Sequence, residues 1–218
     1  MSTRRTTSTA ISTRGLTKRY GDAVALDDLT LDVQAGEVCG LLGHNGAGKT
    51  TTVSILTTLL RPTEGTALIA GHSVDQGSMD VRRSIGYLPE NVQFYDELTM
   101  LENLRFFAQL SGLRRPDSRI REVLELLGFE GHEQQRLGTF SKGMRQRVGI
   151  AQAILHRPEG VFLDEPASGL DPEGVRVLRE TIATINHELG ITVFMNTHLL
   201  SEVSRSCTSI GILKQGRL

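Results

Sequence analysis

Residues 43–51 read Gly-His-Asn-Gly-Ala-Gly-Lys-Thr-Thr and directly follow the apolar run at residues 37–42. Three glycines in so short a loop need a geometric reason, because a glycine that is held still loses more conformational entropy than any other residue. The stretch satisfies the pattern G-x-x-x-x-G-K-[ST], whose backbone N–H groups surround the phosphates of a nucleotide. A purely structural glycine turn would need neither the lysine nor the threonine. We therefore predict a buried strand, a phosphate-binding loop and a helix over residues 49–60.

The polar residues of this pattern have distinct chemical roles. Lys49 would reach the β- and γ-phosphates of the nucleotide, and the Thr50 hydroxyl would ligate Mg²⁺. A second apolar run, at residues 160–163, ends in Asp164 and Glu165. Asp164 can hold the Mg²⁺ through its water, and Glu165 stands where a general base would orient an attacking water. The alternative is an acidic residue that caps a helix after a core strand.

Further strands and helices alternate along the chain. Near-continuous apolar strands are expected at 66–70, 84–88, 160–163, 191–196 and 208–213. Helical spacing covers about 99–137, the segment after Ser141, residues 172–189 and a short stretch from Leu199. This alternation is typical of an α/β fold with a parallel sheet covered on both faces. Residues 11–33 instead show short alternations around a Tyr20-Gly21-Asp22 turn, which predicts an antiparallel pair.

Composition narrows the possible functions. The 218 residues are 39% hydrophobic and 22% charged with a formal net charge of −1, so no basic field draws nucleic acid and we expect no nucleic-acid partner. Cys39 and Cys207 lie far apart in apolar runs, which favours neither a disulfide nor a zinc site. No run approaches the ~20 apolar residues of a membrane helix. If the protein works at a membrane, another chain spans it.

The two ends of the chain carry weaker signals. Residues 1–10 are rich in Ser, Thr and Arg and are expected to form a flexible tail, with an organelle transit peptide as the alternative. One domain is then expected over residues 11–218. Residues 214–217 resemble a hairpin turn directly before the last residue, Leu218. We therefore expect the natural C-terminus to be missing.

From about Ile11 to Leu218 the chain resembles the ATP-binding subunit of ABC transporters. Residues 140–147, Phe-Ser-Lys-Gly-Met-Arg-Gln-Arg, are similar to the signature segment of that family, which usually reads Leu-Ser-Gly-Gly-Gln. The resemblance implies a P-loop NTPase of ABC type: a mostly parallel core sheet, an N-terminal antiparallel β flap and an inserted helical subdomain at about 99–140. It also implies that ATP and Mg²⁺ are the cofactors.

The resemblance also implies site residues. His198 would be the switch histidine that contacts the γ-phosphate and, with Glu165, would be catalytic; residues 168–171 look like the D-loop that links two sites of a dimer. Tyr20 matches the aromatic residue that stacks on adenine. The ATP-binding residues would be Tyr20, Gly43, His44, Asn45, Gly46, Ala47, Gly48, Lys49, Thr50 and Thr51. The signature residues, which would bind the ATP of a partner subunit, are Ser141, Lys142, Gly143 and Met144.

Several residues depart from the family pattern. Lys142 and Met144 replace usual signature residues, a variant that resembles exporters of the ABC-2 type. Glu90 stands where the family usually has a glutamine that touches Mg²⁺. A carboxylate can still ligate Mg²⁺, so the expected metal residues are Thr50, Asp164 and Glu90.

The resemblance implies an ATPase that drives export. Two copies would sandwich two ATPs head to tail beside an ABC-2-type integral membrane permease, peripherally on the cytoplasmic face of the cell membrane. The amino-acid sequences of residues 43–51, 87–98 and 140–147 are most similar to those of the ATPase of the copper-linked exporter that helps mature nitrous oxide reductase. The ATPases of multidrug and sodium exporters share much of these sequences. Soluble ABC ATPases of cofactor assembly, and those of nucleic acid or translation, are the alternatives. Only 91 positions separate Thr50 from Ser141, which leaves no room for the coiled coils of DNA-repair members.

Overall fold

The computed structural model describes residues 8–218, and its first elements form an antiparallel sheet. This sheet has the strand order β2-β1-β4-β5. Its strands are β1 (Thr9–Tyr20), β2 (Ala23–Gln34), β4 (Glu64–Ile69) and β5 (His72–Ser73). Thr9 pairs with Gln34, so the sheet includes residues 9 and 10, the last two residues of the expected N-terminal tail. Residues 1–7 of that expected tail lie outside the described residues.

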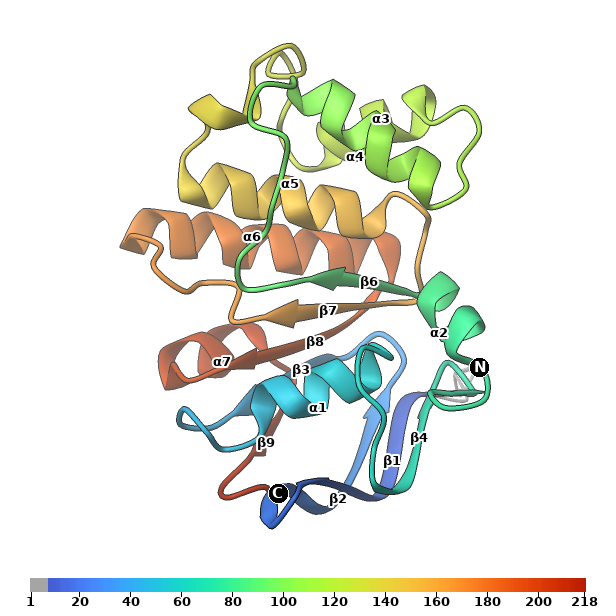
Figure 1. The fold of residues 1–218 in the computed structure, drawn as a ribbon. Coiled ribbons are helices and arrows are strands. Elements are labelled where there is room, and N and C mark those ends of the chain that lie inside the picture. The colour runs from blue at the N-terminus through green and yellow to red at the C-terminus, as the bar shows by residue number, and fades with distance from the viewer. Residues whose placement is uncertain (1–7) are drawn as a thin grey trace, which may run out of the picture.

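The second sheet is parallel throughout. Its strand order is β6-β7-β8-β3-β9, and every neighbouring pair runs in the same direction. The strands are β3 (Val38–Leu42), β6 (Ile85–Leu88), β7 (Gly160–Asp164), β8 (Thr192–Thr197) and β9 (Ser209–Ile212). The predicted α/β fold, with a parallel core sheet and an N-terminal antiparallel flap, is confirmed (Figure 1).

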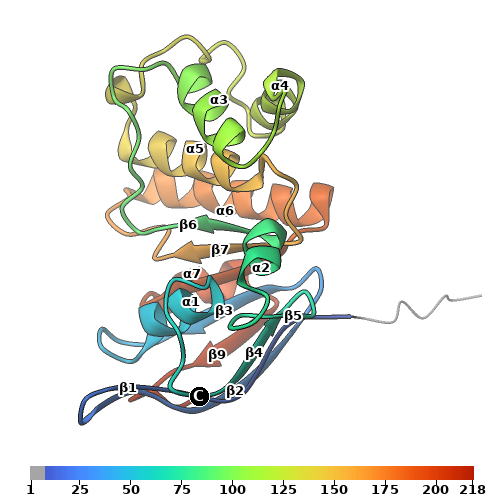
Figure 2. The same ribbon diagram turned by 45° about the vertical axis from the view of Figure 1, so that its right-hand side comes forward.

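Helices cover both faces of the parallel sheet. The α1 helix lies between the two sheets, whereas α5 and α6 cover the opposite face and carry the α3–α4 pair on their outer side (Figures 1 and 2). The helices are α1 (Lys49–Leu56), α2 (Ser78–Ser84), α3 (Met100–Leu110), α4 (Asp117–Leu126), α5 (Lys142–Ile154), α6 (Pro172–Leu189) and α7 (Leu200–Ser206), with a short 3₁₀ turn at Leu137–Thr139. Among the described residues, none of these helices is both long and apolar enough to cross a membrane.

Two hydrophobic cores lie on the two faces of the parallel sheet. Successive side chains of a strand point to opposite faces, and β7 shows this alternation: Val161 and Leu163 join the core beneath α5 and α6, whereas Phe162 joins the core around α1. Phe162 packs on Phe194 of β8 with ring centroids 5.5 Å apart. Because both faces are buried, these strands read as continuous apolar runs in the sequence.

The β6 strand and the α5 helix touch through glycines. A Cβ atom on Gly86 would overlap the carbonyl oxygen of Ala153, and one on Gly149 would overlap the Leu88 side chain. The strand backbone at Gly86 therefore lies directly on the helix backbone, and the Leu88 side chain packs directly on the helix backbone at Gly149. This contact fixes α5, whose first turn contains the signature segment, relative to the strand that leads to Glu90.

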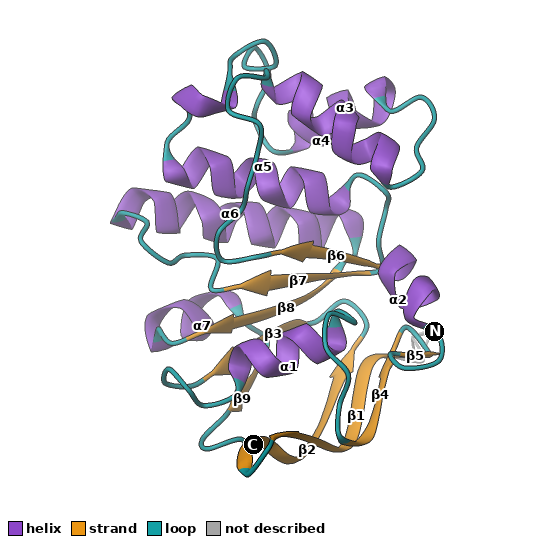
Figure 3. Cartoon of the chain, in the orientation of Figure 1, coloured by secondary structure: helices purple, strands orange, loops and turns teal. Residues whose placement is uncertain are grey.

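The structure differs from the expected elements in several places (Figure 3). The first helix ends at Leu56 rather than residue 60, because Thr58 adopts a left-handed φ of 63° and the N–H groups of the next two residues both donate to Ser54 O. The α2 helix and the two-residue β5 were not predicted. In the expected helical subdomain, the helical pattern of about 99–137 consists of two helices and a 3₁₀ turn.

Candidate functional site

The phosphate loop bends tightly against neighbouring backbone, which explains its glycines. A Cβ atom on Gly43 would lie 2.6 Å from Leu213 O. Gly48 caps α1 at a φ of 107°, and its Cβ would lie 2.6 Å from Ala25 O. No other residue fits these positions without strain. The loop thus places the first turn of α1 at the opening of a cavity. The N–H groups of this turn have no acceptor within the helix.

That cavity has a volume of about 640 Å³ and lies at the carboxyl ends of the parallel strands. It brings together segments that are far apart in the sequence: the phosphate loop, the segment after β6, the segment after β7 and the end of β8. The lining residues are Ala25, Asn45, Gly46, Gly48, Lys49, Thr50, Thr51, Glu90, Glu165, Ser168 and His198. Open α/β sheets bind ligands at this edge.

Lys49 and Glu165 form a buried ion pair at the base of this cavity. Lys49 Nζ lies 3.3 Å from Glu165 Oε1, and the two side chains are only 5% and 11% exposed. The same ammonium donates hydrogen bonds to the carbonyl oxygens of Gly43 at 2.7 Å and His44 at 3.2 Å. The lysine therefore bridges the loop through two carbonyl oxygens and one carboxylate, and the oxygens of an incoming phosphate can replace these partners.

His198 completes this arrangement from the other side. Its Nδ1 lies 2.8 Å from Glu165 Oε2, so one carboxylate contacts both a lysine and a histidine. Glu165 adopts a left-handed φ of 45°, which is costly for a residue other than glycine. Such backbone strain is concentrated at functional sites because the surrounding contacts must hold it there.

Asn196 is a site residue that sequence reasoning missed. It is fully buried, its Nδ2 donates to Asp164 Oδ1 at 2.7 Å, and its Oδ1 accepts from the Glu165 N–H at 2.9 Å. One amide thus orients both acidic residues. A polar residue at the carboxyl end of an otherwise apolar strand, two positions before His198, is the sequence signal that could have identified it.

Asp164 lies beside this amide in an environment that disfavours its charge. Burial raises the pKa of the Asp164 carboxyl, and the negative charges of Glu90 and Glu165 raise it further. Burial and the same aspartate also raise the pKa of Tyr87 to about 12; the Tyr87 hydroxyl lies 3.5 Å from Asp164 Oδ2. A bound cation would relieve this crowding of negative charge.

The expected metal residues fit a cation that is shared with a nucleotide. Thr50 and Glu90 line the cavity, and Asp164 precedes the cavity residue Glu165. Among residues 8–218, no three His, Cys, Asp or Glu side chains are grouped so that they could hold a metal by themselves. A hydroxyl, one or two carboxylates and phosphate oxygens are the donors that Mg²⁺ usually has in nucleotide sites.

The signature residues lie elsewhere. Ser141 caps α5 by accepting from the Met144 N–H at 3.3 Å, and the four signature residues line a second cavity of about 440 Å³ together with Gly169, Leu170 and Asp171. This cavity shares no lining residue with the phosphate-loop cavity. Within one chain, the signature segment and the phosphate loop therefore do not line one pocket.

Tyr20 also lies outside the phosphate-loop cavity. It ends β1 and is 52% exposed, with Lys18 Nζ 5.1 Å from its ring centroid. The strand paired with it supplies Ala25 to the cavity wall. About half of the Tyr20 surface is therefore accessible, and one face of its ring carries the Lys18 ammonium.

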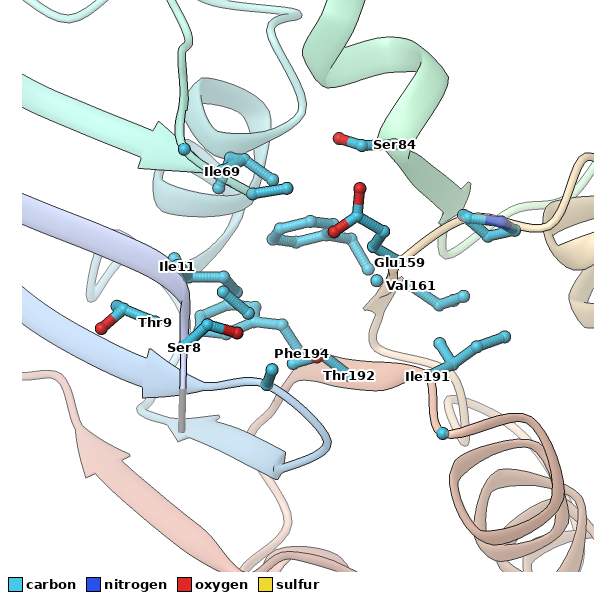
Figure 4. Close-up of a pocket in the computed structure, with 18 of the residues that line it drawn as sticks. Ser8, Thr9, Ile11, Ile69, Ser84, Glu159, Val161, Ile191, Thr192 and Phe194 are labelled. Carbon is cyan, nitrogen blue, oxygen red and sulfur yellow. The ribbon is translucent and has the colours of Figure 1, made fainter. Parts of the chain in front are cut away.

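A cavity of similar volume, about 630 Å³, lies at the opposite, amino ends of β7 and β8. Figure 4 shows its apolar walls, which include Ile11, Ile69 and Phe194, together with the Glu159 and Ser84 side chains. It contains neither a phosphate loop nor any of the residues expected at the site. The candidate site is therefore the cavity at the carboxyl edge.

Comparison with known proteins agrees with this geometry. The family model described as "ABC transporter" matches residues 26–168. The bacitracin transport ATP-binding protein BcrA of Bacillus licheniformis is 42% identical over 211 residues, which cover 97% of this chain and 69% of that protein. The linearmycin resistance ATP-binding protein LnrL of Bacillus subtilis is 34% identical over 95% of this chain and 67% of its own length.

Solved structures give the same result. The cbiO1 protein of Clostridium perfringens, described as part of the ABC transporter complex cbiONQ, aligns with a TM-score of 0.88 and 28% identity over 96% of this chain and 86% of that one. A dimeric ATP-binding cassette in a post-hydrolysis state, bound to ADP and Pi, aligns with a TM-score of 0.82 and 26% identity over 95% of this chain and 96% of its own.

Proposed function

Because the chain belongs to the ATP-binding domains of ABC transporters and is an ATPase by family, we propose that it drives export through an ABC-2-type membrane permease. Two copies would act together, with ATP and Mg²⁺, peripherally on the cytoplasmic face of the membrane. The observation that carries the hydrolytic part of the proposal is the contact of Glu165 with both Lys49 and His198 in the phosphate-loop cavity, at 3.3 and 2.8 Å.

Hydrolysis follows from this arrangement. The phosphates of ATP would take over the ammonium of Lys49 from the Gly43 and His44 carbonyls and from Glu165. Glu165, freed from the lysine, would accept a proton from the water that attacks the γ-phosphorus, and the bond to the β-phosphate oxygen breaks to leave ADP. His198 would keep the Glu165 carboxylate oriented through its 2.8 Å contact and would face the γ-phosphate.

Mg²⁺ would be held by the Thr50 hydroxyl and Asp164, with the Glu90 carboxylate as a further candidate ligand, and would neutralise charge on the phosphates. Asn196 orients Asp164 from behind, which leaves the other carboxylate oxygen for a metal-bound water. The adenine would stack on Tyr20, where an aromatic face offers little hydrogen-bonded recognition of one base over another.

A second copy of the chain would complete the site. The signature cavity, with Ser141 at the helix N-terminus and no nucleotide loop of its own, suits a γ-phosphate held by another subunit. Two chains related by a two-fold axis would then enclose two ATPs, each between one phosphate loop and the other signature segment. The dimeric cassette with ADP and Pi, which this chain resembles, supports the arrangement.

Two cargo classes are candidates. The names of the relatives, bacitracin transport and linearmycin resistance, favour a cargo of the same kind as bacitracin or linearmycin. The sequence resemblance to the copper-linked exporter of nitrous oxide reductase maturation offers a second cargo class. ATP-binding subunits do not normally contact cargo, so the two classes need a test in cells.

Two experiments test the proposal. First, the tagged chain should co-purify with an integral membrane protein from detergent-solubilised membranes; recovery of the chain alone, in the soluble fraction, would favour a soluble assembly ATPase. Second, a chromosomal Lys49→Ala variant should lower the bacitracin concentration that stops growth, and deletion of the gene should have the same effect. Unchanged bacitracin tolerance with loss of nitrous oxide reductase activity would favour the copper-linked cargo.

A further inference from the structure

We propose that Glu90 and Lys142 hold the loop at Ser168-Gly169 from two sides and thereby position Glu165 for hydrolysis. Both would be positioning residues, because each would act on Glu165 through its contact with the loop. Both are also departures from the family pattern: glutamine is usual at the first position and glycine at the second. The inference rests on the proposed role of Glu165 and is independent of the cargo.

Glu90 contacts the loop from the cavity side. The Ser168 hydroxyl donates to Glu90 Oε1 at 3.1 Å, and both residues line the phosphate-loop cavity. The Ser168 N–H donates in turn to the carbonyl oxygen of Glu165 at 3.0 Å. Two hydrogen bonds therefore connect the Glu90 carboxylate to the strained backbone of Glu165.

Lys142 contacts the loop from the helical side. A Cβ atom on Gly169 would lie only 2.7 Å from Lys142 Nζ, so the ammonium sits against the bare backbone of this glycine. Gly169 has a φ of 66°, which other residues adopt only with strain. The glycine thus provides both the turn and the space that the lysine occupies.

The two side chains approach the loop with opposite charges. Glu90 and Lys142 both line a groove of about 210 Å³ that separates the segment after β6 from the start of α5. Their attraction across the loop is weak because both are exposed. The two contacts matter because they fix the position of the loop and hence of Glu165. A shift of about 1 Å in a catalytic group can lower the rate by a large factor.

A rival role for Glu90 is ligation of Mg²⁺, and the two roles predict different kinetics. A metal ligand would change the Mg²⁺ requirement of the reaction and would act independently of Ser168 and Lys142. A positioning residue would change kcat, would leave the Mg²⁺ requirement unchanged, and would depend on its partners in the loop.

The test is a double-mutant cycle on ATP hydrolysis by the full chain. Glu90→Gln, Ser168→Ala and Lys142→Met should each lower kcat by about threefold to tenfold, with KM for ATP within about twofold of wild type. Glu90→Gln combined with Lys142→Met should be no slower than the slower single variant, because loss of either side releases the loop. Lys142→Arg should keep at least half of the activity, and Arg83→Met, which removes an exposed cation on α2, should match wild type.

Three results would overturn the inference. Full activity of Lys142→Met shows that the lysine does not act on the loop. Independent, multiplying losses in the double variant show that Glu90 and Lys142 are not coupled. A raised Mg²⁺ requirement in Glu90→Gln but not in Ser168→Ala assigns Glu90 to the metal instead. Glu165→Gln is the reference variant. Hydrolysis at the wild-type rate by that variant would refute the proposed role of Glu165 as base, rather than the positioning roles of Glu90 and Lys142.

Discussion

Replacing Lys49 by alanine should nearly abolish ATP binding. In the structure the Lys49 side chain is 5% exposed, and its ammonium contacts two carbonyl oxygens and one carboxylate. The oxygens of a triphosphate would take the places of these groups around the ammonium. Charge-assisted hydrogen bonds to two phosphate oxygens contribute about 1.5–3 kcal/mol each. Their loss, about 3–6 kcal/mol in total, corresponds to an ATP Kd roughly 10²- to 10⁴-fold higher.

The same substitution should also weaken the nucleotide-free fold, because it leaves the Glu165 carboxylate without its lysine. We expect the free energy of unfolding to fall by about 1–3 kcal/mol, or roughly 2–10 °C in Tm. Equilibrium titration with a fluorescent ATP analogue and thermal unfolding measure the two effects. Lys214→Ala, which removes an exposed lysine, is the matched control. A Lys49→Ala protein that binds ATP within about threefold of wild type would refute the assignment of this loop.

Three further predictions concern the same cavity. Asp164→Asn should abolish hydrolysis and should raise the Tm of the nucleotide-free protein at pH 7. Because the pKa of Asp164 is raised in the folded protein, this carboxyl stabilises the fold only while it is protonated. The gain in Tm from asparagine should therefore vanish as the pH falls below the usual pKa of an aspartate. An equal gain at all pH values would exclude charge as the cause. Tyr20→Ala should weaken ATP and GTP binding alike, by about 0.5–1.5 kcal/mol; a loss confined to one nucleotide in the same titration contradicts stacking. Glu165→Gln should sediment as a dimer with ATP and as a monomer with ADP, and adding Ser141→Arg should restore the monomer. A Glu165→Gln protein that stays monomeric at saturating ATP and Mg²⁺ counts against the sandwich.

The phosphate loop and its flanking elements could be predicted because their geometry depends on local chemistry. Gly43 and Gly48 are required by close backbone contacts, and the strand and helix that flank them carry uninterrupted apolar or helical patterns. Such signals lie within a few residues of one another. The alternation of strands and helices then determines the parallel sheet.

Contacts between site residues from different strands could not be predicted from local sequence patterns. The sequence assigned a role to Glu165 and to His198 separately, but their 2.8 Å contact depends on how β7 and β8 pair. Asn196 was missed for the same reason. The seven-residue α2 helix was missed because it buries only Val81 and Ser84 and has no capping side chain, so it lacks a periodic pattern.

The glycine contacts between β6 and α5 have a mechanical consequence. With Gly86 against Ala153 O and Gly149 against the Leu88 side chain, strand and helix cannot slide past each other without a collision. A displacement of the segment at Glu90, which follows β6, should therefore move Ser141 at the start of α5 by a similar amount, because β6 and α5 move together as one rigid body. A side chain larger than hydrogen at either glycine would separate the two elements and convert this stiff connection into a compliant one.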